Sequence, residues 1–593
     1  MSRIKTIFRK QGRLRARVAL PLLLTLMLGH AGCFLDETVE PYAGRIMVPR
    51  TQEFHWSDGG LPQTFDPAFA AAPPDTDVVR AIFEGLTDYD PRLLTPVPAV
   101  ASRWESSNGG RVWTFYLRDD ARWSNGEPVT ASDFVRSWRR IVKIGALAPH
   151  TDLLANIEGP QKKEPGNLPV IPTQAGRPAA AISKAAEPTT RGDLEGGFGA
   201  EAVSDSVLRV RLRRPDMNFA ALVAHPVFRP VKLKEEYATA RLIPADLISN
   251  GAFSLAKTGG ESVLLERANH YWDKQQVALD RVEFVGTSDA ESALASYRSG
   301  EVDAVTNAAF EPLAIKLLTP YEDFRRTTYS ALTYYTFNTS HAPFDDVRVR
   351  EALALGFDRE RVSEDDLGGA TEPAKRFLPD VVSDSRKPVV EKSELLEKDY
   401  EHAKELLTEA GYPNGQGFPK IRLLINRNEQ QRIVAQSIAA MWRSVLNIET
   451  EIVVKNWEDY ESAARAGDYD VVRRGMVMQT TDELTNIRAL FGEGFSSSHS
   501  ASDGEQLTTA KTPGANAATT KQARLGTLRP IETESQALND LSAMPIYFAS
   551  SYALVKPYVK GFDSNVLDAP SLKTVRIENG WRQPETAGSS WTR

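Results

Sequence analysis

Residues 104–140 read WESSNGGRVWTFYLRDDARWSNGEPVTASDFVRSWRR, and the pattern of this stretch changes twice. After the glycine pair at 109–110, apolar and polar residues alternate, so that Trp113, Phe115 and Leu117 fall on one face of an extended chain. Alternation with a period of two is typical of a half-buried β-strand. The stretch therefore predicts a strand with these three side chains directed toward a core.

A helix is predicted directly after this strand. Asn125-Gly126 favours a turn, and Thr130 followed three residues later by Asp133 has the pattern of a capping box. Apolar residues then recur at helical spacing, at Phe134, Val135, Trp138 and Ile141. Strand, turn and capped helix are common to many α/β domains, so this stretch alone indicates a scaffold.

The order of further motifs along the chain is more specific. They are DP at 66–67 with FEGL at 83–86, SNGAF at 249–253 with NHYW at 269–272, FN at 337–338 with PFDDVRVR at 343–350, AKELL at 403–407 with AGYP at 410–413, and MPIY at 544–547 with VKP at 555–557. With residues 104–140, these motifs resemble the extracellular solute-binding proteins of family 5, the oligopeptide-binding lipoproteins of ABC importers. The resemblance covers nearly all of the chain after about residue 50.

This resemblance implies an α/β, periplasmic-binding-protein-like type II fold, with two lobes around a cleft and an extra inserted domain. The implied segments are a signal peptide at 1–32, a lipidated tether at 33–44, lobe I at 45–90, 222–305 and 557–593, an inserted domain at 91–221, and lobe II at 306–556. A chain that crosses between lobes more than once provides hinge strands for closure around a ligand.

The N-terminus has the pattern of a secretory signal peptide. Seven Lys and Arg residues precede a short apolar run at 18–28, which Ala31-Gly32-Cys33 follow. The small residues before Cys33 resemble a lipoprotein processing site, although His30 stands where Leu is usual. We expect Cys33 to be lipidated and to anchor the mature chain in the periplasm or cell envelope. The alternative is an ordinary cleaved signal with an incidental cysteine.

Composition excludes several classes of protein. Cys33 is the only cysteine among 593 residues, which rules out an intramolecular disulfide and any CxxC site. Removing the seven cations of the signal leaves 64 Lys and Arg against 78 Asp and Glu, a net charge of about −14 that argues against nucleic-acid binding. With 41% hydrophobic residues, the chain can build two or three domains.

Two helices and two loose segments are predicted outside the opening stretch. Residues 399–413 predict a helix with Ala403, Leu406, Leu407 and Ala410 on one face, ended by Gly411 and Pro413. Asp345 is expected to cap a second helix with the stripe Val349, Ala352, Leu353 and Phe357. Residues 164–199 and 496–522 lack sustained periodicity and are expected to be loops.

The resemblance places part of the ligand cleft on residues 465–479. Arg473 matches a family arginine able to hold a carboxylate by a two-pronged pair, and the alternative is a structural ion pair with Asp470. Gly475 would let the backbone approach a ligand, and Tyr547 would lend a hydroxyl group, although packing explains each of them as well.

The same segment departs from the family at the expected amino-terminal subsite. Gln479 stands where oligopeptide binders usually carry an Asp that pairs with the ligand's α-amino group, and Met476 stands where they carry Trp. An amide accepts a hydrogen bond but does not neutralise an ammonium, so weaker binding of free-amine peptides is expected. Leu61 replaces a nearby family acid, and Asp482 is the acid closest in sequence that would substitute.

Signatures of enzymes are missing from the sequence. It contains no HExxH, no GxSxG and no P-loop motif, so we expect neither catalysis nor a cofactor. His55, with Glu53 and Asp58 nearby, suggests a metal site only weakly, since no second histidine lies close in sequence. We expect no bound metal.

The leading hypothesis is a monomeric substrate-binding lipoprotein of an ABC importer, which captures oligopeptides or related solutes. Its expected partners are a peptide or peptide-like ligand, the importer's permease subunits and a membrane reached through the lipid, with no nucleic acid. Two alternatives stay open. One is a receptor for blocked or cell-wall peptides, and the other is a degenerate fold with a structural or signalling role, motivated by Met476 and by Arg474, which replaces a small residue.

Overall fold

The computed structural model describes residues 41–159, 198–232, 247–380, 395–491 and 530–584. The signal peptide with Cys33, residues 164–197 of the first expected loop and all of the second lie outside these ranges. Within them, no helix combines the length and the apolar character needed to cross a membrane.

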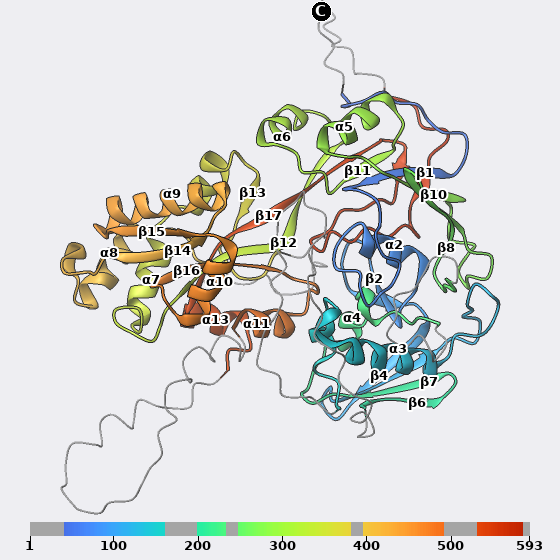
Figure 1. Ribbon diagram of the computed structural model, residues 1–593, viewed down its shortest axis with the longest axis horizontal. Coiled ribbons are helices and arrows are strands. Elements are labelled where there is room, and N and C mark those ends of the chain that lie inside the picture. The colour runs from blue at the N-terminus through green and yellow to red at the C-terminus, as the bar shows by residue number, and fades with distance from the viewer. Residues whose placement is uncertain (1–40, 160–197, 233–246, 381–394, 492–529, 585–593) are drawn as a thin grey trace, which may run out of the picture.

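One mixed sheet of eleven strands runs through the described part of the molecule (Figure 1). Ten strands follow in the spatial order β15 (Thr450–Lys455), β14 (Ile421–Asn426), β16 (Val471–Val477), β12 (Phe324–Phe337), β17 (Ala543–Val555), β11 (Ala304–Thr306), β1 (Glu53–Asp58), β10 (Arg281–Val285), β9 (Ser262–Arg267) and β8 (Phe253–Gly259). The short strand β13 (Thr371–Pro373) pairs with β17 off this path.

The long strands β12 and β17 join two bodies. They pair antiparallel from Phe324 opposite Leu554 to Thr336 opposite Ala543, with register shifts between Thr328 and Leu332 and between Thr333 and Tyr334. Separate clusters of buried apolar residues lie toward the two ends of this pair. In Figure 1 the pair spans the centre of the molecule between these bodies.

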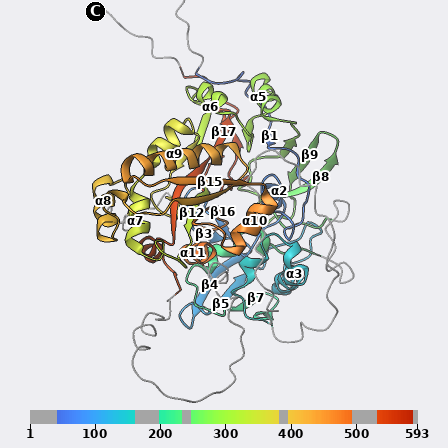
Figure 2. The same cartoon turned by 60° about the vertical axis from the view of Figure 1, so that its left-hand side comes forward.

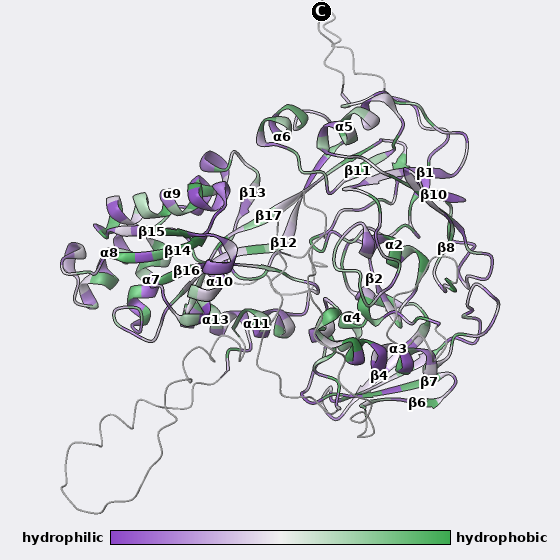
Figure 3. Ribbon diagram, viewed as in Figure 1, coloured by the Kyte–Doolittle hydropathy of each residue, from purple (hydrophilic) through white to green (hydrophobic). Residues whose placement is uncertain are grey.

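The body at the left of Figure 1 is an α/β layer structure with an apolar core (Figure 3). It contains α7 (Val347–Leu355), α8 (Tyr400–Glu409), α9 (Glu429–Leu446), α10 (Trp457–Ala466), α11 (Glu483–Phe491) and α13 (Glu534–Asp540). Strand β14 has buried residues on both faces: Leu423 packs in the cluster of α7, α8 and α9, and Leu424 packs with α10. Both faces of β14 are therefore covered by helices.

The other body holds the remaining strands of the large sheet and several shorter elements (Figure 2). These are α2 (Asp75–Ile82), α4 (Phe219–Leu222), α5 (Ala290–Ser299), α6 (Pro312–Leu318), and the strand pairs β2 (Thr87–Tyr89) with β3 (Pro96–Pro98) and β18 (Val559–Lys560) with β19 (Arg576–Ile577).

Residues 104–140 contribute to a separate four-stranded sheet and to the helix beside it. Its order is β4 (Ala101–Ser107), β5 (Val112–Leu117), β7 (Val207–Arg211) and β6 (Ala200–Ser204), with α3 (Ala131–Ile144) beside it. The predicted strand is confirmed, because every second residue of β5 is buried. The capping box is confirmed as well, since the Thr130 N–H donates to Asp133 Oδ2 at 2.8 Å.

The two other predicted helices form, and one of them begins a residue later than expected. In α8 the side chain of Asp399 accepts from the His402 N–H, and Gly411 follows with φ of 95°. The prediction that Asp345 caps α7 is wrong. Asp346 caps it, because its Oδ1 accepts the Arg348 N–H at 2.9 Å while Asp345 is exposed.

Candidate functional site

Strands β12, β16 and β17 bring three of the predicted ligand residues to one face of the sheet. Gly475 on β16 and Tyr547 on β17 both lie opposite Thr333 on β12, and Arg473 lies opposite Tyr335. Side chains on a strand alternate between faces, and residues directly opposite each other share a face. The register therefore gathers Arg473, Gly475 and Tyr547, with Tyr335 among them.

Arg473 is buried and does not form the ion pair considered from the sequence. Its relative exposure is 8%, and its Nε has no hydrogen-bond partner in the described part of the chain. Asp470 instead pairs with Arg422 at 3.6 Å and with His341 at 3.8 Å. The Arg473 guanidinium is therefore a buried cation whose counter-ion is not Asp470.

Gly475 makes room for this guanidinium. A Cβ atom added at Gly475 would lie 3.0 Å from Nη2 of Arg473 and 3.4 Å from its Cζ. Contacts this short are uncommon for a Cβ atom, so a side chain at position 475 would require the Arg473 guanidinium to shift slightly. The glycine thus has a role in the structure that does not require contact with a ligand.

The two tyrosines on this face differ in how their hydroxyl groups are used. The Tyr547 hydroxyl accepts hydrogen bonds from Gln431 Nε2 at 2.8 Å and from Gln430 Nε2 at 3.4 Å, which ties β17 to α9. The Tyr335 hydroxyl is buried without a hydrogen-bond partner among the described residues. Burial also raises the pKa of Tyr335, so this hydroxyl keeps its proton and can donate a hydrogen bond to an anion.

Gln479 lies beyond the end of β16, apart from that face, and contacts a histidine of the other body. His225 Nδ1 accepts the Val227 N–H at 3.2 Å, so the ring proton is on Nε2, which lies 3.4 Å from Gln479 Oε1. The ring of His150 lies edge-on to His225 at 4.8 Å. Burial lowers the pKa of both histidines, so Gln479 faces a neutral imidazole.

Asp482 is engaged in structural hydrogen bonds. Its Oδ2 accepts the Thr485 N–H at 2.7 Å in the first turn of α11, and its Oδ1 accepts from Asn218 Nδ2 at 2.9 Å. Burial, above all, and the charge of Asp482 raise the pKa of nearby Asp216 to about 6. Asp482 and Gln479 together tie the segment between β16 and α11 to the residues around α4.

Arg474, for which the sequence indicated no role, points to the other face of β16. Its Nη1 lies 3.9 Å from Glu461 on α10, and electrostatic interactions link it to Tyr334, Tyr460 and Tyr469. Arg473 and Arg474 therefore serve different faces of one strand.

His55 has a structural environment. Its Nδ1 lies 3.2 Å from Asp303 Oδ2 and its Nε2 lies 3.7 Å from Glu283 Oε2. A hydrogen bond to Asp303 raises the pKa of His55. Among the described residues, no group of three His, Cys, Asp or Glu side chains is arranged to hold a metal ion.

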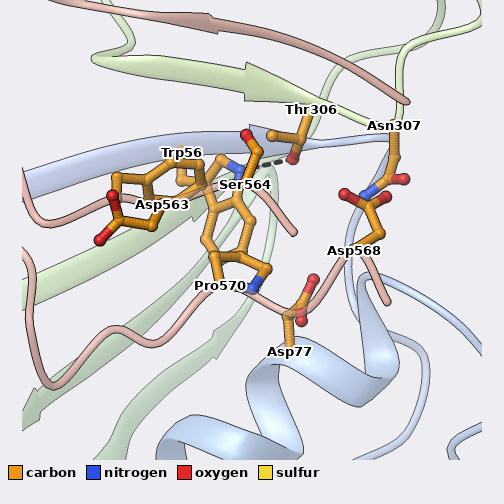
Figure 4. A pocket seen from close by; sticks show the side chains of 9 residues that line it. Trp56, Asp77, Thr306, Asn307, Asp563, Ser564, Asp568 and Pro570 are labelled. Atoms are coloured by element: carbon orange, nitrogen blue, oxygen red, sulfur yellow. Dashed lines mark hydrogen bonds between the residues drawn. The ribbon is translucent and has the colours of Figure 1, made fainter. Parts of the chain in front are cut away.

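Apart from the residues predicted to bind a ligand, a polar recess lies where β1, β11 and α2 meet the segment after β18 (Figure 4). Asp77 and Asp568 reach it from α2 and from that segment, beside Asn307. Arg80 pairs with Asp77 at 2.8 Å, and Asp58 accepts from Asn307 at 2.6 Å. Burial raises the pKa of Asp58, of Asp77 and, to about 6, of Asp568. No motif in the sequence signalled this cluster.

Three further residues of the candidate site carry no motif and were not expected from the sequence. Tyr335, His225 and Gln431 reach the predicted residues only through the register of β12 and the packing of α4 and α9. The last eight residues of β12 are all buried, on both faces, so no alternation in the sequence distinguishes the face of Tyr335 or identifies the neighbouring strands.

Comparison with known proteins gives consistent matches over most of the chain. The family described as bacterial extracellular solute-binding proteins, family 5 Middle, matches residues 95–498. The periplasmic murein peptide-binding protein MppA of Escherichia coli (strain K12) is 30% identical over 85% of this chain and 89% of its own length.

Solved structures agree with this result. The unliganded open form of MppA superposes with a TM-score of 0.68 at 28% identity, over 89% of this chain and 98% of that one. The Haemophilus influenzae OppA complex with the peptide RPPGFSPFR gives 0.54 at 26% identity, over 90% and 100%. The prediction of an α/β fold of the two-lobe periplasmic-binding-protein type is confirmed. Because the family matches more than half of the chain, this protein belongs to the bacterial extracellular solute-binding proteins of family 5.

Proposed function

We propose that this chain is the ligand-capturing subunit of an ABC importer, which binds oligopeptides and delivers them to a permease without changing them chemically. Family membership and the peptide ligands named for MppA and OppA support this proposal. The single observation in this chain that carries it is the guanidinium of Arg473, whose buried Nε has no partner among the described residues, on the face shared with Gly475 and Tyr335.

A carboxylate is the ligand group that suits this arrangement. A buried cation without a counter-ion is costly, and a carboxylate can bind a guanidinium through two parallel hydrogen bonds. The Tyr335 hydroxyl, which has no partner within the described chain, lies across from Arg473 in the strand register and supplies a further donor. We therefore expect Arg473 to hold a carboxylate of the peptide.

Calorimetric titration with a peptide carrying a free C-terminus and with its C-terminally amidated form tests this assignment. Arg473→Gln is expected to weaken binding of the free-acid peptide by at least about thirtyfold, because the variant leaves a desolvated carboxylate unpaired. The amidated peptide should bind the wild-type protein and Arg473→Gln with similar, weak affinity.

Arg474→Gln is the matched control, since Arg474 occupies the next position but faces α10. It should bind the free-acid peptide as the wild-type protein does. Equal affinity of the wild-type protein for the free-acid and amidated peptides would contradict a carboxylate-binding role of Arg473.

A second candidate is a receptor for peptides whose amino end is blocked. The observation that favours it is the contact of Gln479 with the neutral ring of His225, which occupies the amide oxygen. Under this proposal Gln479→Asp raises affinity for a free-amine peptide relative to its acetylated form. If the ratio of the two affinities is unchanged, the blocked-peptide candidate fails.

The location of the protein is part of the same proposal. We infer that the chain is a monomeric lipoprotein anchored through Cys33, with residues 91–221 as an inserted domain and no catalytic activity or nucleic-acid binding. The signal-like N-terminus supports the anchor, and the separate sheet β4–β5–β7–β6 supports the inserted domain. The mass of the mature N-terminal peptide tests the anchor, because lipidation at Cys33 adds acyl chains.

Native mass spectrometry of the protein purified from its own compartment separates these candidate functions. A retained mixture of peptides supports the importer subunit. An empty protein that binds no peptide pool would favour the degenerate, structural or signalling alternative.

A further inference from the structure

The first described residues of the chain are packed into the body that carries α5 and α6. Tyr42 and Ala43 are buried, and the Ala43 N–H donates to Asp323 Oδ1 at 2.8 Å. Buried Lys556 donates to the Arg45 carbonyl at 2.8 Å. These contacts hold the chain in place from about residue 41 onward.

The point where this packing begins lies close to α6. The Glu322 N–H donates to the Pro41 carbonyl at 2.9 Å, and Glu322 follows the last residue of α6, Leu318, by only four positions. Figure 1 shows α5 and α6 together at one end of the molecule. The chain therefore enters the folded body beside α6.

Helix α6 is apolar on both its inner and its outer side. Its sequence is PLAIKLL, with Lys316 as its one charged residue (Figure 3). Ile315 and Leu318 are buried, with Leu318 packed in the cluster that contains Ala43. Leu313 and Leu317, one turn apart, are exposed at 69% and 64%. Packing against the core explains Ile315 and Leu318, but it gives no role to the exposed Leu313 and Leu317.

We propose that the exposed face of α6, formed by Leu313 and Leu317, rests on the lipid surface of the membrane that anchors the chain. The inference rests on the proposed lipidation of Cys33. Pro41 follows Cys33 by only eight positions, and a fully extended chain of this length reaches about 27 Å. The tether therefore keeps the point where the chain enters the body, beside α6, within about 27 Å of the lipid anchor.

The chemistry of the face suits the boundary between headgroups and acyl chains. Leucine side chains enter that boundary readily. Lys316 lies at the flank of this face and directs its ammonium toward the other body, because Nζ would lie 3.8 Å from a Cβ atom added at Gly368. Tethering raises the effective concentration of the face at the surface, so a contact of two leucines is sufficient. The lobe that carries α6 would then be oriented relative to the membrane.

The test uses the full chain, lipidated in a bacterium and reconstituted in vesicles of phosphatidylethanolamine and phosphatidylglycerol without any permease. Because lipidation consumes the sulfur of Cys33, the variant Leu313→Cys has a single free thiol for an environment-sensitive fluorophore. We expect the label at position 313 to emit severalfold more strongly in these vesicles than in detergent-free buffer without lipid. We also expect brominated lipids in the vesicles to quench this emission strongly. Leu317→Ser in the same background should reduce the quenching.

Val454→Cys is the matched control. Val454 is exposed at 42% on β15, in the other body, and its label should stay water-exposed. A label at 313 that behaves like the label at 454 would overturn the proposal. So would a response that appears only after permease is added, because the face would then bind that protein.

The same sample tests the lipid anchor and the peptide-binding function separately from the membrane contact of α6. A mature N-terminus without lipid, read from its mass, overturns the membrane contact together with the anchor. Peptide binding by this sample reports separately on the capture function, which does not depend on α6.

Discussion

At the scale of single residues, the cluster around Arg80 shows how burial controls charge. Asp77 pairs with Arg80 at 2.8 Å, Asp58 and Asp568 interact electrostatically with the same guanidinium, and a side-chain hydrogen bond links Asp58 with Asp77. Burial favours the neutral form of a carboxyl group, so the cluster retains protons that the unfolded chain releases.

The sign of the pH dependence follows from this shift. The pKa of Asp568 is raised from an ordinary value near 4 to about 6, so its favourable contribution to folding is complete below about pH 4 and is lost as pH rises through 6. Asp568→Asn is expected to increase the free energy of unfolding at pH 8 by about 2 kcal/mol and to leave stability at pH 4 nearly unchanged.

Urea denaturation at pH 4, 6 and 8 measures this difference. The Ser551 hydroxyl donates to Asp568 Oδ1 at 3.0 Å, and the amide of the Asp568→Asn variant keeps an oxygen that can accept this bond, so the substitution isolates the charge. The exposed Asp119→Asn is the control and should not alter the pH profile. A wild-type-like profile for Asp568→Asn would show that the cluster does not set the pH dependence.

At the scale of single elements, α3 is defined by its first turn and by one buried face. Thr130 and Asp133 exchange hydrogen bonds at its start, and Trp138 donates to the Phe228 carbonyl at 2.8 Å. A capping box satisfies N–H groups that have no partner within the helix. The helix is therefore held both by its own sequence and by the segment that follows α4.

Thr130→Ala is expected to lower the free energy of unfolding of the domain that contains α3 by about 1 kcal/mol, because the cap is lost while the buried face stays. Urea denaturation followed by tryptophan fluorescence measures the loss, since Trp113, Trp123 and Trp138 are all buried there. Thr258→Ala, at an exposed site on β8, should stay within about 0.5 kcal/mol of the wild-type protein.

At the scale of the whole molecule, the relative position of the two bodies is the property on which capture depends. The chain superposes with a TM-score of 0.68 on the unliganded open form of MppA and of 0.54 on a peptide complex of OppA. The bodies are connected through β12 and β17, whose pairing is interrupted between Thr328 and Leu332. An interruption in the ladder is a place where two strands can bend together.

Small-angle scattering should therefore show a smaller radius of gyration when a free-acid peptide binds the wild-type protein. Arg473→Gln at the same peptide concentration should keep the larger radius, because it no longer retains the ligand. Bound peptide without any compaction would contradict closure about β12 and β17, even if the affinity is high.

Local sequence determined the elements whose signals lie within a few residues of one another. The alternation that buries Trp113, Phe115 and Leu117, the capping box of Thr130 with Asp133 and the end of α8 at Gly411 all form as predicted, because neighbouring side chains and backbone groups control them. The error at Asp345 is of the same local kind: either of two adjacent aspartates fits the cap, and side-chain geometry selects Asp346.

Only the tertiary structure decided what the candidate site contains. The sequence placed Arg473, Gly475 and Tyr547 in the cleft through family resemblance, but the register of β12 determines that they share a face with Tyr335. The same holds for Gln479 with His225, which are far apart in the chain. Strand register and packing between distant segments depend on the whole core and not on local pattern, so the order of motifs identifies the family while the fold decides which charges are paired.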